Sequence, residues 1–454
     1  MKDIFLLEDN GMFVLFAPLK GLILEINNEE KQKIERLLNQ SNFCFENIIN
    51  LFPEIDRAKL IKKELMGQNN ILQTTKFCPD SLVLFPTFDC NLRCIYCYSK
   101  AGEKKINMNW QIAKTAIDFV IENAKSNGSK ENNLEFHGGG EPTWNWPVFE
   151  KAFDYFKEKT TAEEITPNIS VATNGVLSKT QLNWITNHFN SVQVSLDGTR
   201  EIQNFQRPTA GGGKSFEIVY NAIRTLLENK INVTIHCTIT EKGVDNIPEI
   251  VRFFLNDFPG AAIHLEPACK CGRCAQTEQE FPNPDSFIQG FIESEKMIRA
   301  KNSEIYYSGT SSKLTEFRQN FCGASLPNFI VTPTGLVTAC HEVAEKEHAF
   351  ANYFIYGFLD QQNNNFVFDS EKIKKLQSCS IHSYCENCFA KYFCMGECLV
   401  KSLNKNGERN FPNLNPRCKI NRELTKYFIF QKIREQVLKK EVWHGQASKA
   451  GSCS

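Results

Sequence analysis

The sequence predicts an α/β fold in which a partial barrel of six β/α units lies between two smaller units. Apolar runs alternate with amphipathic helical stretches from about residue 81 onward, whereas the first 75 residues contain short apolar runs separated by turn residues. Cysteines then become dense between Cys322 and Cys418. With 454 residues, of which 42% are hydrophobic, the chain is long enough to bury a barrel-sized core.

The central part of the chain contains six strand candidates, and helical stretches such as 110–123 and 215–229 lie between them. The strand candidates are 82–88, 134–136, 169–172, 192–196, 233–239 and 262–265. Repeated β/α units imply parallel strands joined by right-handed crossovers. Six strands are too few to close an eight-stranded barrel, so the barrel is expected to be open.

The N-terminal part, residues 1–75, is expected to form a small α+β unit. Its three apolar runs read as short strands because turn residues separate them, and helical patterns follow. The strands are expected at 4–7, 12–16 and 22–26, and the helices at 29–38, 45–51 and 57–66. After about residue 281 the strand–helix pattern is lost, so metal rather than a large apolar core is expected to shape that segment. A last helix is expected over 422–440, before a polar tail.

Charge and cysteine content narrow the class of protein. Lys plus Arg and Asp plus Glu both number 52, so the chain offers no electrostatic footprint for nucleic acid or an anionic membrane. The first residues lack a basic, then apolar, signal segment, and no apolar stretch reaches the roughly 20 residues of a membrane span. A cytoplasmic location is therefore expected. In that reducing compartment eighteen cysteines indicate metal rather than disulfides.

Three cysteines lie on one short loop directly after the first barrel strand. Cys90, Cys94 and Cys97 have the spacing C-x3-C-x2-C. Three thiolates hold three irons of a [4Fe-4S] cluster and leave the fourth iron open to a non-protein ligand. A zinc site normally needs a fourth protein ligand close by, and the loop offers none. The spacing therefore favours an iron–sulfur cluster with an open iron.

Polar residues recur at the carboxyl ends of the next strands. The second strand ends in three glycines, 138–140, which allow close backbone approach to a ligand, and Glu141 can accept a hydrogen bond from an ammonium group. The third ends at 173–175 and the fourth at 195–198, while Arg207 downstream is a candidate partner for a carboxylate. Since barrels bind ligands at this end of their strands, these residues are expected to line one cleft.

These motifs resemble the radical S-adenosylmethionine (SAM) superfamily. The resemblance implies that the cluster of the first loop binds the amino and carboxylate groups of SAM, with Tyr96 near the adenine. It also implies that one electron splits SAM into methionine and a 5′-deoxyadenosyl radical, which takes a hydrogen atom from the substrate. The cofactor-binding residues it implies are Tyr96, Gly139, Gly140, Glu141, Asn174, Ser195 and Arg207.

The C-terminal cysteines resemble the seven-cysteine SPASM extension at every spacing. That resemblance implies two auxiliary [4Fe-4S] clusters, hence three clusters in the chain. The ligands of one would be Cys385, Cys388, Cys394 and Cys418, and three ligands of the other Cys322, Cys340 and Cys398. The fourth ligand of the latter stays open between two alternatives: a cysteine among Cys269, Cys271 and Cys274, or an iron left free for a substrate thiolate.

SPASM enzymes mostly modify peptides or proteins. The N-terminal unit resembles a winged-helix-like element that holds the leader of a ribosomally made peptide as an added edge strand. We therefore expect a peptide maturase that forms, for example, a thioether, a carbon–carbon crosslink or an epimerised centre. Its partners would be a precursor peptide and an electron donor such as flavodoxin or ferredoxin. The expected domains are 1–75 for leader recognition, 81–300 for the barrel, 301–425 for SPASM and 426–454 for a helix and tail.

Two other functions compete with the peptide maturase. A sulfatase maturase oxidises Cys or Ser to formylglycine, and in that family an Asp after the second SPASM cysteine acts as the base. This chain has His341 there, which is a candidate catalytic base by its ordinary pKa or, alternatively, a histidine without a chemical role. A non-catalytic electron carrier would explain the clusters but not the Gly139, Gly140, Glu141 and Ser195 elements.

Overall fold

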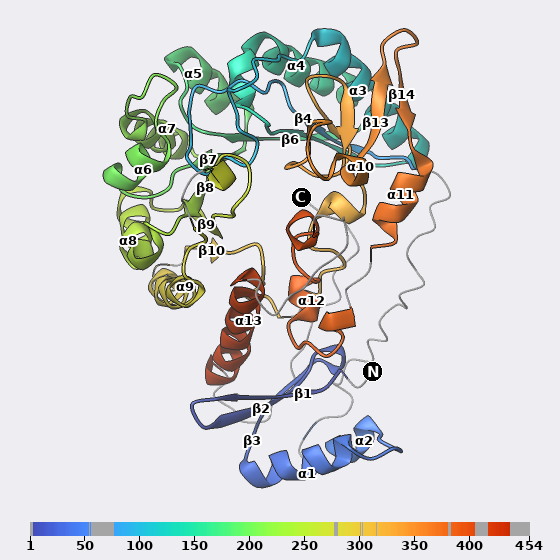
Figure 1. The fold of residues 1–454 in the computed structure, drawn as a ribbon, viewed down its shortest axis with the longest axis vertical. Helices are drawn as coiled ribbons and strands as arrows, with labels where there is room; N and C mark the ends of the chain where they lie inside the picture. The colour runs from blue at the N-terminus through green and yellow to red at the C-terminus, as the bar shows by residue number, and fades with distance from the viewer. Residues whose placement is uncertain are drawn as a thin grey trace.

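The structure is a computed structural model that describes residues 3–53, 55, 77–276, 280–299, 301, 303–314, 316–379, 383–404 and 416–435. The expected helix at 57–66 and the polar tail lie outside these residues. Figure 1 shows a curved sheet with helices on its outer side and a smaller sheet at the opposite end of the molecule.

Six parallel strands form the partial barrel that the sequence predicted. They are β4 (Ser81–Leu84), β5 (Glu131–Phe136), β6 (Thr166–Thr173), β7 (Ser191–Ser195), β8 (Asn232–Ile239) and β9 (Ala262–Pro267), hydrogen-bonded in this order. The helices that cover them are α3 (Trp110–Asn127), α4 (Trp146–Ala162), α5 (Lys179–His188), α6 (Arg200–Gln206), α7 (Phe216–Glu228), α8 (Ile247–Asp257) and α9 (Pro284–Arg299). A short strand, β10 (Ile305–Tyr306), extends the sheet beyond β9.

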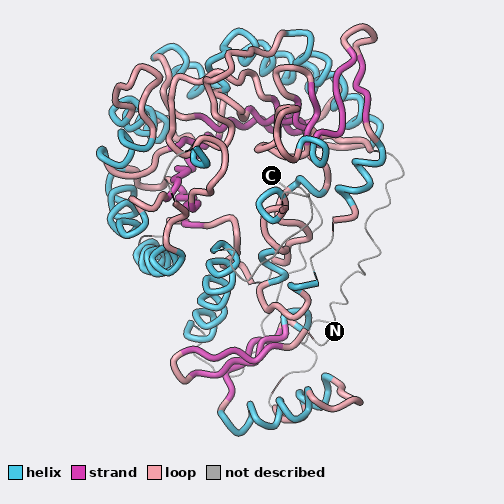
Figure 2. The backbone as a smooth tube through the Cα atoms, in the orientation of Figure 1, coloured by secondary structure: helices cyan, strands magenta, loops and turns pink. Residues whose placement is uncertain are grey.

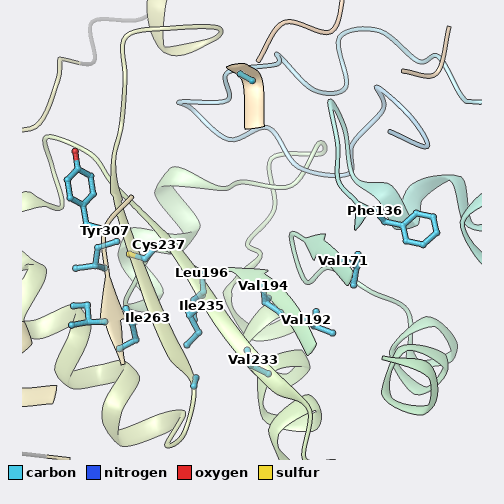
Figure 3. Packing of buried hydrophobic residues seen from close by; sticks show 14 of the residues in the cluster. Phe136, Val171, Val192, Val194, Leu196, Val233, Ile235, Cys237, Ile263 and Tyr307 are labelled. Atoms are coloured by element: carbon cyan, nitrogen blue, oxygen red, sulfur yellow. The ribbon is translucent and has the colours of Figure 1, made fainter. Parts of the chain in front are cut away.

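Side chains of each strand alternate between the helix layer and the barrel interior. In β8, Val233, Ile235 and Cys237 are buried toward the helices, where they pack with Val192 and Val194 of β7 (Figure 3). The intervening residues of each strand face the interior. This alternation, which made the strands predictable, also decides which polar residues line the interior.

The N-terminal sheet has strands at the predicted positions. β1 (Phe5–Asp9), β2 (Met12–Ala17) and β3 (Leu22–Ile26) are antiparallel, and α1 (Asn28–Leu38) and α2 (Phe45–Ile49) follow. Asn27 begins α1 with a capping box to Glu30. One face of the sheet packs on these helices, whereas Phe16 on the other face stacks on Phe393, with ring centroids 6.3 Å apart.

The C-terminal segment has more regular structure than the sequence predicted. β11 (Ile330–Val331) pairs in parallel with β4, and β12 (Leu336–Thr338), β13 (Ile355–Asp360) and β14 (Asn365–Phe368) extend the barrel sheet. Phe329, Phe366 and Phe368 pack around Phe119 of α3, with centroids 5.1–5.6 Å apart. An apolar contact with the barrel, and not metal alone, therefore shapes this segment, and α9 continues the helix layer after residue 281.

Three short helices complete this region: α10 (Ala351–Phe354), α11 (Ser370–Gln377) and α12 (Lys391–Cys394). A long helix, α13 (Pro416–Glu435), connects it to the N-terminal sheet. α13 begins six residues before the predicted 422, at Pro416. Its C-terminal part lies beside the N-terminal sheet (Figure 2), where Arg434 forms an ion pair with Asp9 at 2.7 Å. None of the helices in the described ranges has the length and apolar character that a membrane crossing needs.

Candidate active site and cysteine clusters

The loop between β4 and α3 brings Cys90, Cys94 and Cys97 together. Arg93 holds the loop because its guanidinium donates to the carbonyls of Cys90 (2.6 Å) and Gly102 (3.1 Å). Backbone N–H groups aim at two of the sulfurs: Leu92 N lies 3.3 Å from Cys90 Sγ, and Ala101 N lies 3.4 Å from Cys97 Sγ. The sequence prediction that these thiols share one loop at the end of the first strand is thus matched by their placement.

The three thiols fit an iron–sulfur cluster. Burial raises the pKa of Cys90 and raises the pKa of Cys94 to about 12, so a thiolate here requires compensating positive charge. Bound iron would supply that charge. The N–H groups aimed at the sulfurs would then donate to the cluster ligands, which is one way in which proteins adjust the potential of a cluster.

The glycine turn after β5 is docked onto the cysteine loop. Tyr98 Oη donates to the carbonyl of Gly138 (2.9 Å), and Ser99 Oγ donates to that of Gly139 (2.5 Å). A Cβ at Gly140 would lie 2.0 Å from the carbonyl oxygen of Asp89, which is backbone and cannot give way. Glycine is therefore required there for the two motifs to meet.

Glu141 closes this turn and is buried, with 2% of its surface exposed. Its carboxylate accepts from Thr143 Oγ1 (2.7 Å), Thr173 Oγ1 (2.8 Å) and Asn174 N (2.7 Å). Burial raises the pKa of Glu141, and these hydrogen bonds oppose the rise. The hydrogen bonds of this carboxylate therefore connect the end of β5 with the end of β6. This structural role is separate from the predicted role of Glu141 in binding a cofactor.

Asn174 and Ser195 lie where the sequence placed them, at the ends of neighbouring strands. Asn174 Nδ2 donates to Asn91 Oδ1 (2.7 Å) and lies 3.6 Å from Cys90 Sγ. Ser195 ends β7, in register with His236 of β8. The structure thus places Asn174 directly against the cysteine loop. Ser195 lies at the same rim of the barrel, which is the edge formed by the carboxyl ends of the strands.

Asp197 lies in the strand end 195–198 that the sequence placed at the cleft, although it was not among the predicted cofactor-binding residues. It is fully buried and accepts from Arg207 Nε (3.0 Å), Gln206 Nε2 (2.8 Å), Thr238 N (3.0 Å) and the Tyr96 hydroxyl. Arg207, the candidate partner for a carboxylate, thus has one within the chain. Its Nη1 lies 4.0 Å from Cys94 Sγ. The position of Asp197 two residues beyond the end of β7 predicted a place at the cleft, whereas its pairing with Arg207 could not be read from the sequence.

Three polar side chains meet in the barrel interior near the glycine turn. Glu135 lies on β5, His137 directly follows that strand, and His341 follows Cys340; the possible ligand atoms of the three lie within 4.8 Å of one another. His341 Nε2 is buried and has no hydrogen-bond partner among the residues that the structure describes. Burial, and then the nearby His137, lower the pKa of His341 well below its ordinary value, so a neutral imidazole faces the interior. Such a group accepts or donates a hydrogen bond to a bound substrate.

A second buried network connects the barrel to α13. Glu266 of β9 pairs with Arg417 (2.7 Å), which also pairs with Glu397 (2.6 Å). Although burial opposes it, Arg417 holds the pKa of Glu266 well below its ordinary value. The network reaches the cysteines because Asn421 donates to Cys394 Sγ at 3.1 Å.

Four of the predicted cluster ligands surround one cavity of about 260 Å³. These are Cys385, Cys388 and Cys394, which lie within ten consecutive residues, and Cys418, which lies in α13. Burial raises the pKa of Cys394 and of Cys418, so positive charge is required for their thiolates here as well. A cavity lined by four thiols, with a side-chain amide directed at one sulfur, fits an iron–sulfur cluster.

The remaining predicted ligands gather around one ion pair. Lys401 Nζ and Glu342 Oε1 are 3.1 Å apart. Burial is the main cause that raises the pKa of Cys322, Cys340 and Cys398, and the Glu342 carboxylate adds to the rise at each of them. The Glu342 carboxylate of this ion pair therefore affects the pKa of all three thiols.

Comparison with known proteins identifies the central domain. The sequence model of the Radical SAM superfamily matches residues 84–254, which contain the cysteine loop and the glycine turn. The chain contains a radical SAM domain. Enzymes of this superfamily use SAM and a [4Fe-4S] cluster, and the buried thiols of the loop are consistent with such a cluster.

Related sequences include maturases of two kinds. A cysteine-type anaerobic sulfatase-maturating enzyme of Clostridium novyi is 23% identical over 344 residues, 72% of this chain and 87% of that protein. The mycofactocin maturase MftC of Mycobacterium tuberculosis is 25% identical over 326 residues, 69% of this chain and 76% of that protein. An uncharacterized protein of Methanocaldococcus jannaschii is 29% identical, but the match covers 38% of this chain and 58% of that protein, less than two thirds of its length.

Solved structures share the fold over most of the chain. A histidine-tagged form of anSMEcpe with bound AdoMet aligns with a TM-score of 0.65 and 19% identity, covering 79% of this chain and 95% of that chain. Streptococcus suis SuiB bound to its precursor peptide SuiA aligns with a TM-score of 0.53 and 16% identity, covering 90% of this chain and 98% of that chain. At these identities the similarity establishes the fold.

Proposed function

We propose that this radical SAM enzyme is a peptide maturase that modifies a ribosomally made precursor, for example by forming a thioether crosslink. The observation that carries the proposal is the N-terminal sheet. Its outer strand β1 pairs only with β2 among the described residues, so its other edge offers backbone groups to an added strand. A leader peptide bound there would hold the rest of the precursor near the barrel.

The fold comparison supports a role for this sheet. The alignment with SuiB, which was solved with its precursor peptide, extends over 90% of the chain, whereas that with anSMEcpe extends over 79%. The sheet is also fixed to the rest of the chain through Phe393 and the Arg434–Asp9 pair. A leader held by this sheet would therefore have a defined position relative to the cysteine clusters.

The residues of the cleft have separate tasks in the proposed reaction. The loop of Cys90, Cys94 and Cys97 would hold the cluster that binds SAM, with Glu141 and Asn174 beside it. Bound SAM and the reduced cluster would supply the radical that takes a hydrogen atom from the peptide. His341 is proposed as the acceptor, at Nε2, for the proton that leaves the substrate thiol, with His137 beside it.

Two auxiliary clusters are part of the proposal. The four thiols around the 260 Å³ cavity would hold one, and Cys322, Cys340 and Cys398 would contribute to the other. Thioether formation removes two hydrogens from the peptide, so one electron has to leave the substrate after the first hydrogen atom is taken. Auxiliary clusters would give that electron a path out of the substrate to an external acceptor, while a donor such as flavodoxin or ferredoxin would reduce the cluster that binds SAM.

The sulfatase-maturase function remains the second candidate, because the match to the Clostridium novyi enzyme covers 72% of the chain. An anaerobic assay with reconstituted enzyme, dithionite and SAM separates the two. A peptide maturase is expected to form 5′-deoxyadenosine and to remove two hydrogens from a full-length precursor, and to process the leader-free core poorly. Formylglycine in a cysteine-containing sulfatase peptide, with no change in any precursor, would favour the second candidate.

A further inference from the structure

A buried side-chain amide lines the 260 Å³ cavity of the four thiols. It belongs to Asn421, which is 1% exposed and donates from Nδ2 to Cys394 Sγ at 3.1 Å. Asn421 lies in α13, three residues after Cys418, and residues at this spacing share one face of a helix. The helix that would supply one cluster ligand therefore also presents a hydrogen-bond donor to another.

Contacts at both ends of the amide fix its orientation. The Glu397 carboxylate, which pairs with Arg417 at 2.6 Å, accepts a hydrogen bond from Nδ2. A carboxylate held by an arginine accepts but does not donate, so the amide nitrogen has to face Glu397 and Cys394. At the oxygen end, the Tyr307 hydroxyl donates to Oδ1 at 2.7 Å. The two N–H groups and the oxygen of this amide therefore all have partners.

The segment that follows β10 leaves room for the amide. A Cβ at Gly309 would lie 2.0 Å from Asn421 Oδ1 and 2.6 Å from Cε1 of Tyr307. A larger residue at this position would therefore push the amide away from its place. Since Tyr307 and Gly309 are two positions apart, one short segment both binds the amide oxygen and provides the space for it.

A donor directed at a ligand sulfur changes the energy of a reduced cluster. In the proposed reaction one electron leaves the substrate, and the cluster that accepts it gains one negative charge. An N–H group directed at a ligand sulfur stabilises this charge and so raises the reduction potential. The Glu397 carboxylate would act in the opposite direction, but its pairing with Arg417 offsets its charge.

We propose that Asn421 is a positioning residue that raises the reduction potential of the auxiliary [4Fe-4S] cluster in this cavity, acting through the sulfur of Cys394. The inference rests on the proposed auxiliary clusters. The balance of the proposed thioether formation is kept: the hydrogen atom goes to the radical, the proton to His341, and the remaining electron to this cluster and then to the external acceptor. Asn421 makes the cluster a better acceptor for that electron.

Three variants test the role of the amide. Asn421→Leu removes the donor and keeps a side chain that branches at the same carbon. Gly309→Ala keeps the amide but displaces it. Thr425→Val is the matched control because Thr425 is fully buried one turn further along α13, where its hydroxyl oxygen lies 2.7 Å from that of Thr310. This control loses a buried hydrogen bond of the same helix that does not involve a sulfur.

The measurement uses the full chain with Cys90, Cys94 and Cys97 replaced by alanine, so that EPR reports the auxiliary clusters. Each protein is reconstituted anaerobically and its iron is counted. EPR then follows the reduction of the clusters as the potential is lowered. Cys385→Ala in the same parent identifies the signal of the cavity cluster, which it should remove.

Asn421→Leu is expected to keep its iron but to need a lower potential for reduction. At a fixed potential its ratio of reduced to oxidised cavity cluster should fall roughly fivefold, the factor that one hydrogen bond of typical strength gives. Gly309→Ala should lower the ratio as well, and Thr425→Val should keep the ratio of the parent.

An unchanged or higher ratio in Asn421→Leu, or an equal fall in Thr425→Val, would overturn the role of Asn421 while the clusters stand. If Asn421→Leu loses the cavity cluster, Gly309→Ala decides, and a ratio equal to the parent's would overturn the role. A parent without auxiliary iron, or one whose spectrum Cys385→Ala leaves unchanged, would refute the proposed cluster and this role with it.

Discussion

Replacing Asp197 by Asn tests the buried ion pair at the rim of the barrel. Asp197 is fully buried, and Arg207 is 7% exposed, with Nε 3.0 Å from the carboxylate. An Asn side chain keeps the shape but removes the charge, so the guanidinium is left buried and unpaired. Breaking such a pair costs about 3–5 kcal/mol. The amide also has a single oxygen to accept the bonds that Tyr96, Gln206 and Thr238 donate.

This cost corresponds to a large change in melting temperature. A barrel of roughly 200 residues, at about 2.1 cal/mol/K of unfolding entropy per residue, has about 0.4 kcal/mol/K in total. The expected decrease in Tm is therefore about 7–12 °C for Asp197→Asn. Calorimetry under anaerobic conditions, on protein with its clusters reconstituted, measures it.

The matched control is Glu228→Gln, which removes an ion pair with Arg224 on the surface of α7. That pair is 3.2 Å long, but both side chains are more than half exposed and solvent screens their charges, so its loss should lower Tm by about 1 °C at most. If Asp197→Asn melts within about 2 °C of the wild type, the reasoning on buried charge is wrong. Adding Arg207→Met to Asp197→Asn should recover part of the loss, because the unpaired charge is removed.

Three further predictions concern the cleft and the clusters. Gly140→Ala should abolish 5′-deoxyadenosine formation because the added Cβ would lie 2.0 Å from the backbone oxygen of Asp89. Gly211→Ala is the control and should leave this formation unchanged, since no atom lies within 4 Å of its Cβ. Equal formation of 5′-deoxyadenosine by the two variants would show that the close approach at Gly140 is not required. His341→Gln should keep 5′-deoxyadenosine formation but lower peptide modification by about 10²-fold or more, and unchanged coupling of the two products would remove its role as a base. Cys385→Ala should lower the iron content by up to one cluster, while Cys44→Ala, on the N-terminal unit, should not; equal iron in both proteins would exclude Cys385 as a ligand.

Sequence patterns predicted the parts of this molecule whose signal is local. Cys90, Cys94 and Cys97 share one loop, so their spacing alone indicates the cluster. The six barrel strands were found because their alternation persists over several residues. In contrast, β11 and β12 are two and three residues long, too short to carry a periodic signal, and they were missed.

The residues that were missed at the site depend on contacts between distant segments. Glu135 lies on β5 and His137 directly after it, and nothing near them in the sequence indicates that His341 will join them. The Glu342–Lys401 pair likewise joins residues 59 positions apart. A carboxylate or lysine at an isolated position has no distinctive pattern, because most such residues are solvated. Only the fold selects the few that become buried partners.

The same contacts explain why the first cysteine loop can be formed before iron binds. Its carbonyls are held by Arg93 and by Arg273 of the β9 loop, and Tyr98 and Ser99 fix it on the glycine turn. None of these bonds involves a sulfur. In small metal domains the ligands converge only when the metal arrives, so the binding energy is spent on folding. Here the barrel positions the thiols, so the free energy of cluster binding would be available to ionise Cys90 and Cys94, whose pKa is raised by burial.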